Sequence, residues 1–221
     1  MTVEFVTLDT EEGVSLKVRI FRPDEGNAVK EMVIVLVHQY TLLGGCQGLL
    51  KGMASEIAEK GYICVTFDMR GAGRSTGRAS LLAMVEVEDV VAVCKWATVR
   101  LNTSSIVLVG SSVGATIAGS ALEEVEQIKG YVALGYPFGF WGWLFFGHHK
   151  RAVLKSEKPK LFVMGTRDGF TSVKQFVKAL KTASGRVKTH LIPNIGHFEM
   201  ERPRYDATLA QIIASFGKTL E

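Results

Sequence analysis

The sequence is poor in cysteine and has no long uninterrupted apolar run. Its three cysteines cannot all pair with one another, and Cys64 and Cys94 lie inside apolar segments that favour a buried free thiol. This usage excludes a disulfide framework and predicts a reducing, cytoplasmic location. No stretch reaches the roughly 18 apolar residues of a membrane-spanning helix. Residues 1–13 lack the basic and apolar regions of a secretory signal, although prior removal of a transit peptide stays open.

Neither sign of charge is present in large excess. The 221 residues include 26 Lys and Arg against 22 Asp and Glu, which gives a net charge of +4. An excess this small does not predict a nucleic-acid partner. Hydrophobic residues make up 47% of the chain and charged residues 22%, and these values exclude a disordered or collagen-like protein. The length fits a single domain over residues 1–221.

Short apolar runs alternate along the chain with stretches of helical spacing. Period-2 patterns at 2–9 and 14–21, joined by a Gly-bearing link, predict an antiparallel hairpin. Continuous apolar runs, typical of strands buried on both faces, occupy 31–38, 62–68, 105–110, 130–135 and 160–165, with a last strand at 186–192. Helices are predicted at 46–60, 81–100, 112–126, 171–183 and 203–219. The pattern predicts an α/β fold: a mostly parallel twisted sheet with the hairpin at one edge and helices on both faces.

Residues 136–149 break this pattern, because a connection between strands is expected to be polar. Six of these residues are Phe or Trp, and three glycines are expected to interrupt any helix. We expect a short lid-like insertion at about 136–158, with Trp141 and Trp143 contacting an apolar substrate. A buried connection that packs on the core is the alternative.

Residues 150–188 carry eleven Lys and Arg but only two acidic residues. Such an excess would attract an anionic substrate, and it leaves peripheral contact with a membrane surface open. The simpler interpretation is a solvated helix face.

The pattern G-x-S-x-G occurs twice, around Ser75 and around Ser112. A nucleophilic serine of this type sits on a sharp turn between a strand and a helix, where side chains two residues away on either side would collide. Ser112 meets this requirement, because it follows the apolar run 105–110 and precedes a good helix former. Ser75 lies in a Gly- and Arg-rich loop without an entering strand. Ser112 is therefore the predicted nucleophile.

A serine needs a base and an orienting acid, which in this strand–turn–helix context follow it in the order acid, then base. Asp168 is the one Asp between Ser112 and the later histidines, and it follows the run 160–165. His197 follows the last predicted strand and is the expected base. His190 alternates with apolar neighbours, so a structural role is expected there. His148 and His149 precede the Asp and are expected to be solvated or lid residues.

An acyl-transfer site also needs donors for the oxyanion. The backbone N–H of Val113 follows the nucleophile and begins a helix, so it is suitably directed. A second donor is expected from the loop after 31–38, and the backbone N–H of Tyr40 is the first candidate, with Gln39 next.

At these residues the chain resembles an α/β-hydrolase. The resemblance rests on LVHQYTLLGG, FDMRGAGRSTG, VGSSVGA, GTRDGF and IGHF, which occur in the family's order and spacing over nearly the whole chain. It is closest to small, cap-poor serine hydrolases of the dienelactone-hydrolase-like and serine-aminopeptidase-like groups. Their counterpart of DMRGAGRSTG is a structural loop, which implies that Ser75 is a bystander. Many relatives have His-Gly where this chain has His38-Gln39. The Gln side chain is expected to narrow the site or to redirect the loop that carries the second oxyanion donor.

The expected activity is hydrolysis of a small or medium apolar ester through an acyl-enzyme on Ser112. A peptidase or thioesterase with the same triad is an open alternative, as is a non-catalytic binding protein on the same fold. No zinc spacing and no phosphate-binding loop is present, so neither a metal nor a cofactor is expected. The expected partner is a small-molecule ester, and the oligomeric state stays open.

Overall fold

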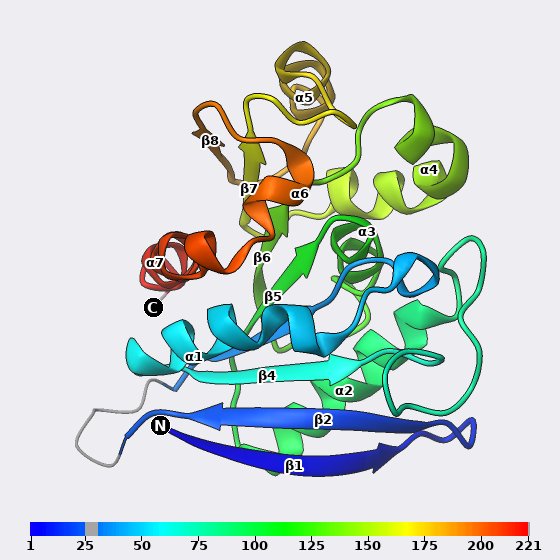
Figure 1. Cartoon of the computed structure of the whole chain (residues 1–221), viewed down its shortest axis with the longest axis vertical. Coiled ribbons are helices and arrows are strands. Elements are labelled where there is room, and N and C mark those ends of the chain that lie inside the picture. The colour runs from blue at the N-terminus through cyan, green and yellow to red at the C-terminus, as the bar shows by residue number, and fades with distance from the viewer. Residues whose placement is uncertain (25–30, 221) are drawn as a thin grey trace.

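The computed structural model describes residues 1–24 and 31–220, which fold around one sheet of eight strands (Figure 1). The strands are β1 Thr2–Asp9, β2 Ser15–Arg22, β3 Val33–Val37, β4 Ile63–Asp68, β5 Ile106–Ser111, β6 Ile128–Leu134, β7 Lys160–Gly165 and β8 Val187–Ile192. Their order is β1-β2-β4-β3-β5-β6-β7-β8. Strands β3 to β8 are mutually parallel, whereas β1 pairs antiparallel with β2, and β2 with β4. The predicted fold, with an antiparallel hairpin at one edge, is confirmed.

Helices cover both faces of this sheet. They are α1 Lys51–Glu59, α2 Glu86–Arg100, α3 Val113–Ser120, α4 Phe140–Lys155, α5 Val173–Leu180, α6 His197–Met200 and α7 Asp206–Gly217, with 3-10 turns at Thr41–Leu43, Gln47–Leu50 and Pro203–Tyr205. Alternate residues of β3 explain the two layers. Val35 packs in the core layer of α2, α3 and α4, whereas Ile34 packs in the layer of α1 and α7. An apolar run that is buried on both faces therefore needs no polar alternation.

The expectation that glycines interrupt any helix in 136–149 is wrong, because α4 spans Phe140–Lys155 without a break. A Cβ at Gly142 would overlap the carbonyl oxygen of Pro137, so a glycine there lets the helix begin close against the preceding turn. Glycine inside a helix costs about 1 kcal/mol. Burial of Phe146 and Val153 against the core offsets this cost. The segment is thus the crossover helix between β6 and β7.

The interpretation of 150–188 as a solvated face is wrong for Lys160, which is fully buried in β7. Its ammonium donates hydrogen bonds to the carbonyl oxygens of Ser156, Lys158 (3.1 Å) and Ser184 (2.8 Å). Burial lowers the pKa of this amine. Lys160 therefore ties the ends of α4 and α5 to the sheet.

His38 fixes the loop that follows β3. The backbone N–H of Met69 donates to His38 Nε2 at 3.0 Å, so Nδ1 carries the proton and donates to the carbonyl of Gln39 at 2.6 Å. The ring is completely buried, and burial lowers the pKa of His38 to about 4. A neutral imidazole therefore connects the loop after β3 to the end of β4.

Stability should reflect this buried neutral histidine. In the unfolded chain the His38 imidazole titrates near about 6.5, and in the folded chain near 4, so acid favours the unfolded state. This group alone should lower the free energy of unfolding by about 2 kcal/mol between pH 8 and pH 5. Urea denaturation of His38→Gln should show a pH dependence that is smaller by that amount. His190→Gln, at an exposed position on β8, is the matched control and should keep the wild-type slope; equal slopes for both variants would contradict the assignment.

Candidate active site

Ser112 occupies a strained turn between β5 and α3. Its backbone has φ 54° and ψ −122°, a conformation that L-residues rarely adopt. A Cβ at Gly110 would overlap the backbone of Ala115, and a Cβ at Gly114 would overlap the carbonyl of His38. The N–H of Ser112 donates to the carbonyl of Leu134 at 2.8 Å, which anchors the turn to β6. Both glycines of the G-x-S-x-G pattern are thus sterically required.

The structure brings the three residues of the predicted triad together at the carboxyl edge of the sheet. Ser112 Oγ lies 2.8 Å from His197 Nε2, and His197 Nδ1 lies 2.6 Å from Asp168 Oδ2. Asp168 and His197 are buried, and Ser112 is half-buried. Ser112, Asp168 and His197 follow β5, β7 and β8, respectively. They meet because parallel strands bring their carboxyl ends to one edge of the sheet.

Backbone groups hold the carboxylate of Asp168 in place. Its Oδ1 accepts hydrogen bonds from the N–H groups of Phe170 (2.8 Å) and Thr171 (2.9 Å), which leaves Oδ2 for the imidazole. His197 begins α6, and its Cε1 lies 3.0 Å from the position that a Cβ at Gly135 would take. The ring and the carboxylate are therefore oriented before any ligand binds.

The structure places Ser75 away from this arrangement. Its hydroxyl accepts from the N–H of Lys17 at 2.9 Å and donates to the carbonyl of Asp68 at 2.6 Å. These bonds connect the Gly-rich loop to β2 and β4. The geometry therefore gives Ser75 a structural environment, as expected.

The other histidines also lie outside the triad. His190 is exposed on β8, although a structural role was expected. His149 is buried, which differs from a solvated position: its Nδ1 lies 2.6 Å from Ser120 Oγ and its Nε2 lies 3.1 Å from the carbonyl of Leu82. His148 Nε2 approaches the same carbonyl at 3.1 Å. Both rings thus attach α4 to the loop that precedes α2.

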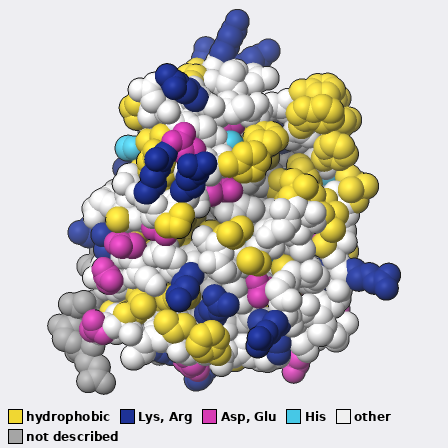
Figure 2. All heavy atoms as spheres, in the orientation of Figure 1, with side chains coloured by type: hydrophobic (Ala, Val, Ile, Leu, Met, Phe, Trp, Pro, Cys, Tyr) yellow, Lys and Arg dark blue, Asp and Glu magenta, His cyan; other side chains and the backbone are white. Residues whose placement is uncertain are grey.

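A cavity of about 460 Å³ opens at Ser112 and His197. Its wall is mostly apolar and comprises Leu43, Leu49, Leu81, Val113, Pro137, Trp141, Phe145, Phe146, Phe170 and Phe198, with Gln39, Tyr40 and Glu201 as polar members. Trp141 lies in this wall as expected. Trp143 does not, because positions two apart on a helix point in widely different directions. Figure 2 shows hydrophobic side chains gathered on the surface over α4, beside this site.

All three residues expected at the oxyanion line the same cavity: Gln39, Tyr40 and Val113. Ser112 caps α3, so the N–H of Val113 is one of the first-turn amides without an acceptor inside the helix. The carbonyl of Tyr40 accepts from the N–H of Gly45 at 3.0 Å, and the Tyr40 hydroxyl donates to the carbonyl of Leu81 at 2.7 Å. The loop that bears the second candidate donor is therefore held in place through both the backbone and the side chain of Tyr40.

Glu201 is a cavity residue that the sequence argument missed. Its Oε1 accepts a hydrogen bond from Ser111 Oγ at 3.0 Å, and it also interacts with the Gln39 side chain. Burial raises the pKa of Glu201. Its position four residues after His197 would have pointed to it, because residues four apart share one face of a helix.

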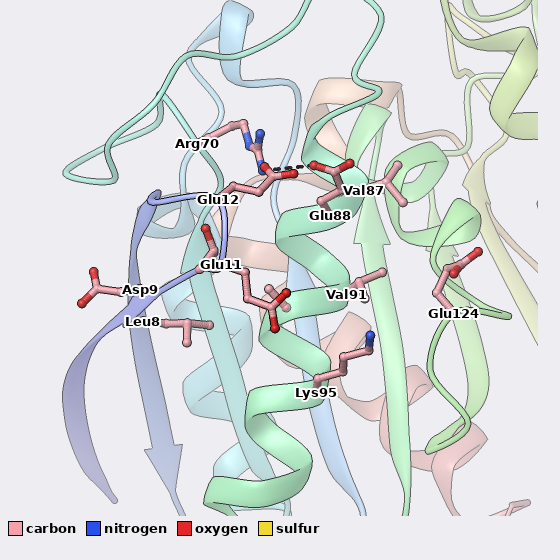
Figure 3. Close-up of a pocket in the computed structure, with 12 residues that line it drawn as sticks. Leu8, Asp9, Glu11, Glu12, Arg70, Val87, Glu88, Val91, Lys95 and Glu124 are labelled. Atoms are coloured by element: carbon pink, nitrogen blue, oxygen red, sulfur yellow. Dashed lines mark hydrogen bonds and ion pairs between the residues drawn. The ribbon is translucent and has the colours of Figure 1, made fainter.

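A second cavity, of about 630 Å³, lies between the β1–β2 turn and α2 (Figure 3). Arg70 lies at its edge, where Nη2 contacts Glu12 at 2.9 Å and Asp89 at 2.8 Å, and Glu88 at 3.6 Å. Its lining residues within the described chain include no serine, cysteine or histidine. This cavity therefore offers ion pairs that hold the hairpin turn against α2, but no nucleophile–base pair.

Within residues 1–24 and 31–220, no cluster of three or more His, Cys, Asp or Glu side chains is arranged to hold a metal ion. In the same part of the chain, no helix combines the length and apolar character needed to cross a membrane.

Comparison with curated proteins gives relatives without an assigned activity. An uncharacterized 31.7 kDa protein from the traX-finO intergenic region of Escherichia coli is 34% identical over 121 residues. The match covers 53% of this chain and 40% of that protein. The chain thus aligns with less than half the length of this relative.

Solved structures with the same fold cover nearly the whole chain. An α/β serine hydrolase homologue from Coxiella burnetii superposes with a TM-score of 0.81 at 23% identity, covering 97% of both chains. A serine hydrolase without a lid from Xanthomonas campestris gives 0.81 at 21% identity, covering 98% of this chain and 94% of that one. The esterase Pf2001 of Pyrococcus furiosus gives 0.75 at 19% identity, covering 99% and 93%. At these identities the likeness concerns the fold.

The match to a protein family is more specific than the similarity of fold. The family described as X-Pro dipeptidyl-peptidase (S15 family) matches residues 12–154, which run from within the β1–β2 turn through the Ser112 turn to near the end of α4. With the fold, the resemblance seen in the sequence and this match in agreement, the chain is an α/β-hydrolase that belongs to the S15 family.

Proposed function

We propose that the protein is a serine hydrolase that cleaves carboxylic esters with a small or medium apolar acyl group. The observation that carries this proposal is the hydrogen-bonded line from Ser112 through His197 to Asp168 at the mouth of an apolar cavity. A serine, a base and an oriented acid in this geometry form the nucleophilic part of an acyl-transfer site.

The proposed reaction has two halves. Ser112 Oγ attacks the ester carbonyl while His197 Nε2 accepts its proton, and Asp168 stabilises the resulting imidazolium. The N–H of Val113 and an N–H of the Gln39–Tyr40 segment would stabilise the oxyanion. His197 then gives the proton to the leaving alcohol, and the same ring activates a water that releases the acid and regenerates Ser112.

The cavity wall supports an apolar substrate. Around Ser112 the wall consists largely of Leu, Phe and Trp side chains, and burying an alkyl chain against them contributes about 0.8 kcal/mol for each CH₂. The volume of about 460 Å³ is in the range of small-molecule sites. A medium-length acyl chain is therefore the proposed substrate group.

A peptidase is the second candidate, and the family match favours it. The same triad would attack an amide, and Glu201 supplies a carboxylate in the cavity wall that would meet a substrate ammonium group. Glycyl-prolyl p-nitroanilide and p-nitrophenyl butyrate, assayed side by side, separate the two. Faster turnover of the anilide would overturn the esterase proposal, and a non-catalytic binding protein would turn over neither.

The nucleophile is tested with the two serines of the G-x-S-x-G patterns. Ser112→Ala should lower kcat/KM for p-nitrophenyl butyrate by at least about 10⁴-fold, because the nucleophile is lost. Ser75→Ala is the matched control, since it removes two structural hydrogen bonds at a cost of about 1 kcal/mol each in stability. It should keep most of the activity. Labelling with a fluorophosphonate probe should disappear only in Ser112→Ala; the opposite pattern would show that the other serine reacts.

The acyl site is tested with the two tryptophans of α4. Trp141 lines the cavity and Trp143 does not, although both are about equally exposed, at 61% and 62%. Trp141→Ala should reduce kcat/KM for an octanoate ester about tenfold more than for an acetate ester, given about 25 cal/mol for each Å² of lost apolar contact. Trp143→Ala should leave the octanoate-to-acetate ratio unchanged. A similar ratio in both variants would show that acyl chains do not contact Trp141.

A further inference from the structure

The outer side of α4 presents large apolar side chains to solvent. Phe140, Trp141, Trp143 and Leu144 are exposed to 61%, 61%, 62% and 50%, and Phe145 to 37%. We call these five residues the aromatic face. Folded proteins usually expose single apolar side chains, whereas a contiguous group marks an interaction site. Figure 2 shows hydrophobic side chains gathered on the surface over α4, where these exposed residues lie.

The aromatic face is not the side of α4 that packs against the core. The core side of α4 consists of other residues, among them Phe146, Val153 and Leu154, and these already attach the helix to the sheet. The exposed rings contact one another instead. The ring centroids of Phe140 and Trp141 lie 5.4 Å apart, and those of the stacked Trp141 and Phe145 rings lie 6.3 Å apart. A preorganised exposed aromatic group therefore needs an explanation other than folding.

The mouth of the catalytic cavity opens in the same region. Seven exposed apolar residues line the cavity: Leu43, Leu49, Leu81, Trp141, Phe145, Phe170 and Phe198. A protein that covered the aromatic face would also obstruct this mouth. A lipid surface would cover the face and at the same time offer acyl chains to the cavity, and this step of the argument rests on the proposed function.

The charged residues of α4 and α5 are all basic. The C-terminal half of α4 carries Lys150, Arg151 and Lys155, and α5 carries the exposed Lys174 and Lys178. Of the acidic groups in and around the cavity, Glu199 pairs with Arg204, whereas Asp168 is buried and Glu201 is half-buried inside the site rather than on its outer surface. Two copies of this region facing each other would bring like charges together, whereas an anionic surface would be attracted.

We propose that the aromatic face docks on an anionic phospholipid surface, with the catalytic cavity turned toward the bilayer. Trp and Phe favour the interfacial layer of a membrane, and each Lys or Arg near anionic headgroups adds to the attraction. Several exposed rings together with a basic flank provide two signals, which stable peripheral binding requires.

Vesicle binding tests this proposal independently of catalysis when all proteins carry Ser112→Ala. Sedimentation with vesicles of 70% phosphatidylcholine and 30% phosphatidylglycerol should recover the protein, and pure phosphatidylcholine should recover at least about tenfold less. Adding Trp143→Gln and Leu144→Gln should weaken binding at least about tenfold through the loss of inserted apolar area. Phe5→Gln is the matched control, because Phe5 is 74% exposed and lies on β1, the edge strand of the sheet that is farther from β6 and β7 in the strand order. Binding that is absent, or equal in both variants, would overturn the proposal.

The basic flank is tested in the same assay. Lys174→Gln with Lys178→Gln should weaken binding to the anionic vesicles by roughly tenfold or more. Lys95→Gln with Lys218→Gln removes the same charge from exposed positions on and beyond other helices and should have little effect. Equal losses in the two pairs would show a general charge effect and overturn the assignment to this flank.

Two further measurements separate the alternatives. With Ser112 intact, the Trp143→Gln, Leu144→Gln protein should hydrolyse a soluble butyrate ester at the wild-type rate, because neither residue lines the cavity. Light scattering should give a monomer; a dimer that this variant dissociates would assign the face to a second copy of the chain and overturn the proposal. Vesicle binding by a protein that hydrolyses no ester would overturn the proposed function and leave the docking surface standing.

Discussion

The turn at Ser112 is the constraint on which the rest of the site depends. An L-residue at φ 54° and ψ −122° is strained, and the surrounding structure must hold it there. Gly114 permits the close approach of the His38 carbonyl, and the N–H of Ser112 bonds to the end of β6. The same contact that permits the turn therefore sets the position of the loop after β3, which carries the candidate oxyanion donors.

Most of the fold could be predicted because the parallel strands are apolar on both faces. Such runs stand out between polar loops, and the residues just beyond them meet at one edge of the sheet. Ser112, Asp168 and His197 each follow such a run, so their meeting required no knowledge of side-chain geometry. The hairpin of β1 and β2 followed from its period-2 pattern in the same way.

The remaining features depend on tertiary contacts that periodicity does not contain. Gly142 is usually a reason to end a helix, yet here it allows the helix to pass the Pro137 carbonyl. Lys160 has the sequence character of a surface residue, yet three carbonyl acceptors compensate its burial. Trp141 and Trp143 could be separated only once the helix was known, since a loop gives no fixed angle between neighbouring side chains. Glu201 was missed because its partner Ser111 is a tertiary contact, although its position four residues after His197 is a signal that the sequence does contain.

Helix α4 contributes both to the core of the fold and to the wall of the cavity. Its inner side satisfies the fold, because Phe146 packs in the core and His149 bonds to Ser120 and to the loop before α2. Its first turns form part of the cavity wall through Trp141. A crossover helix that is already rigid on one side holds aromatic rings at the cavity mouth without a separate cap domain. Stacking of Trp141 on Phe145 also restricts these two rings before a ligand arrives, which favours binding of an apolar chain or surface.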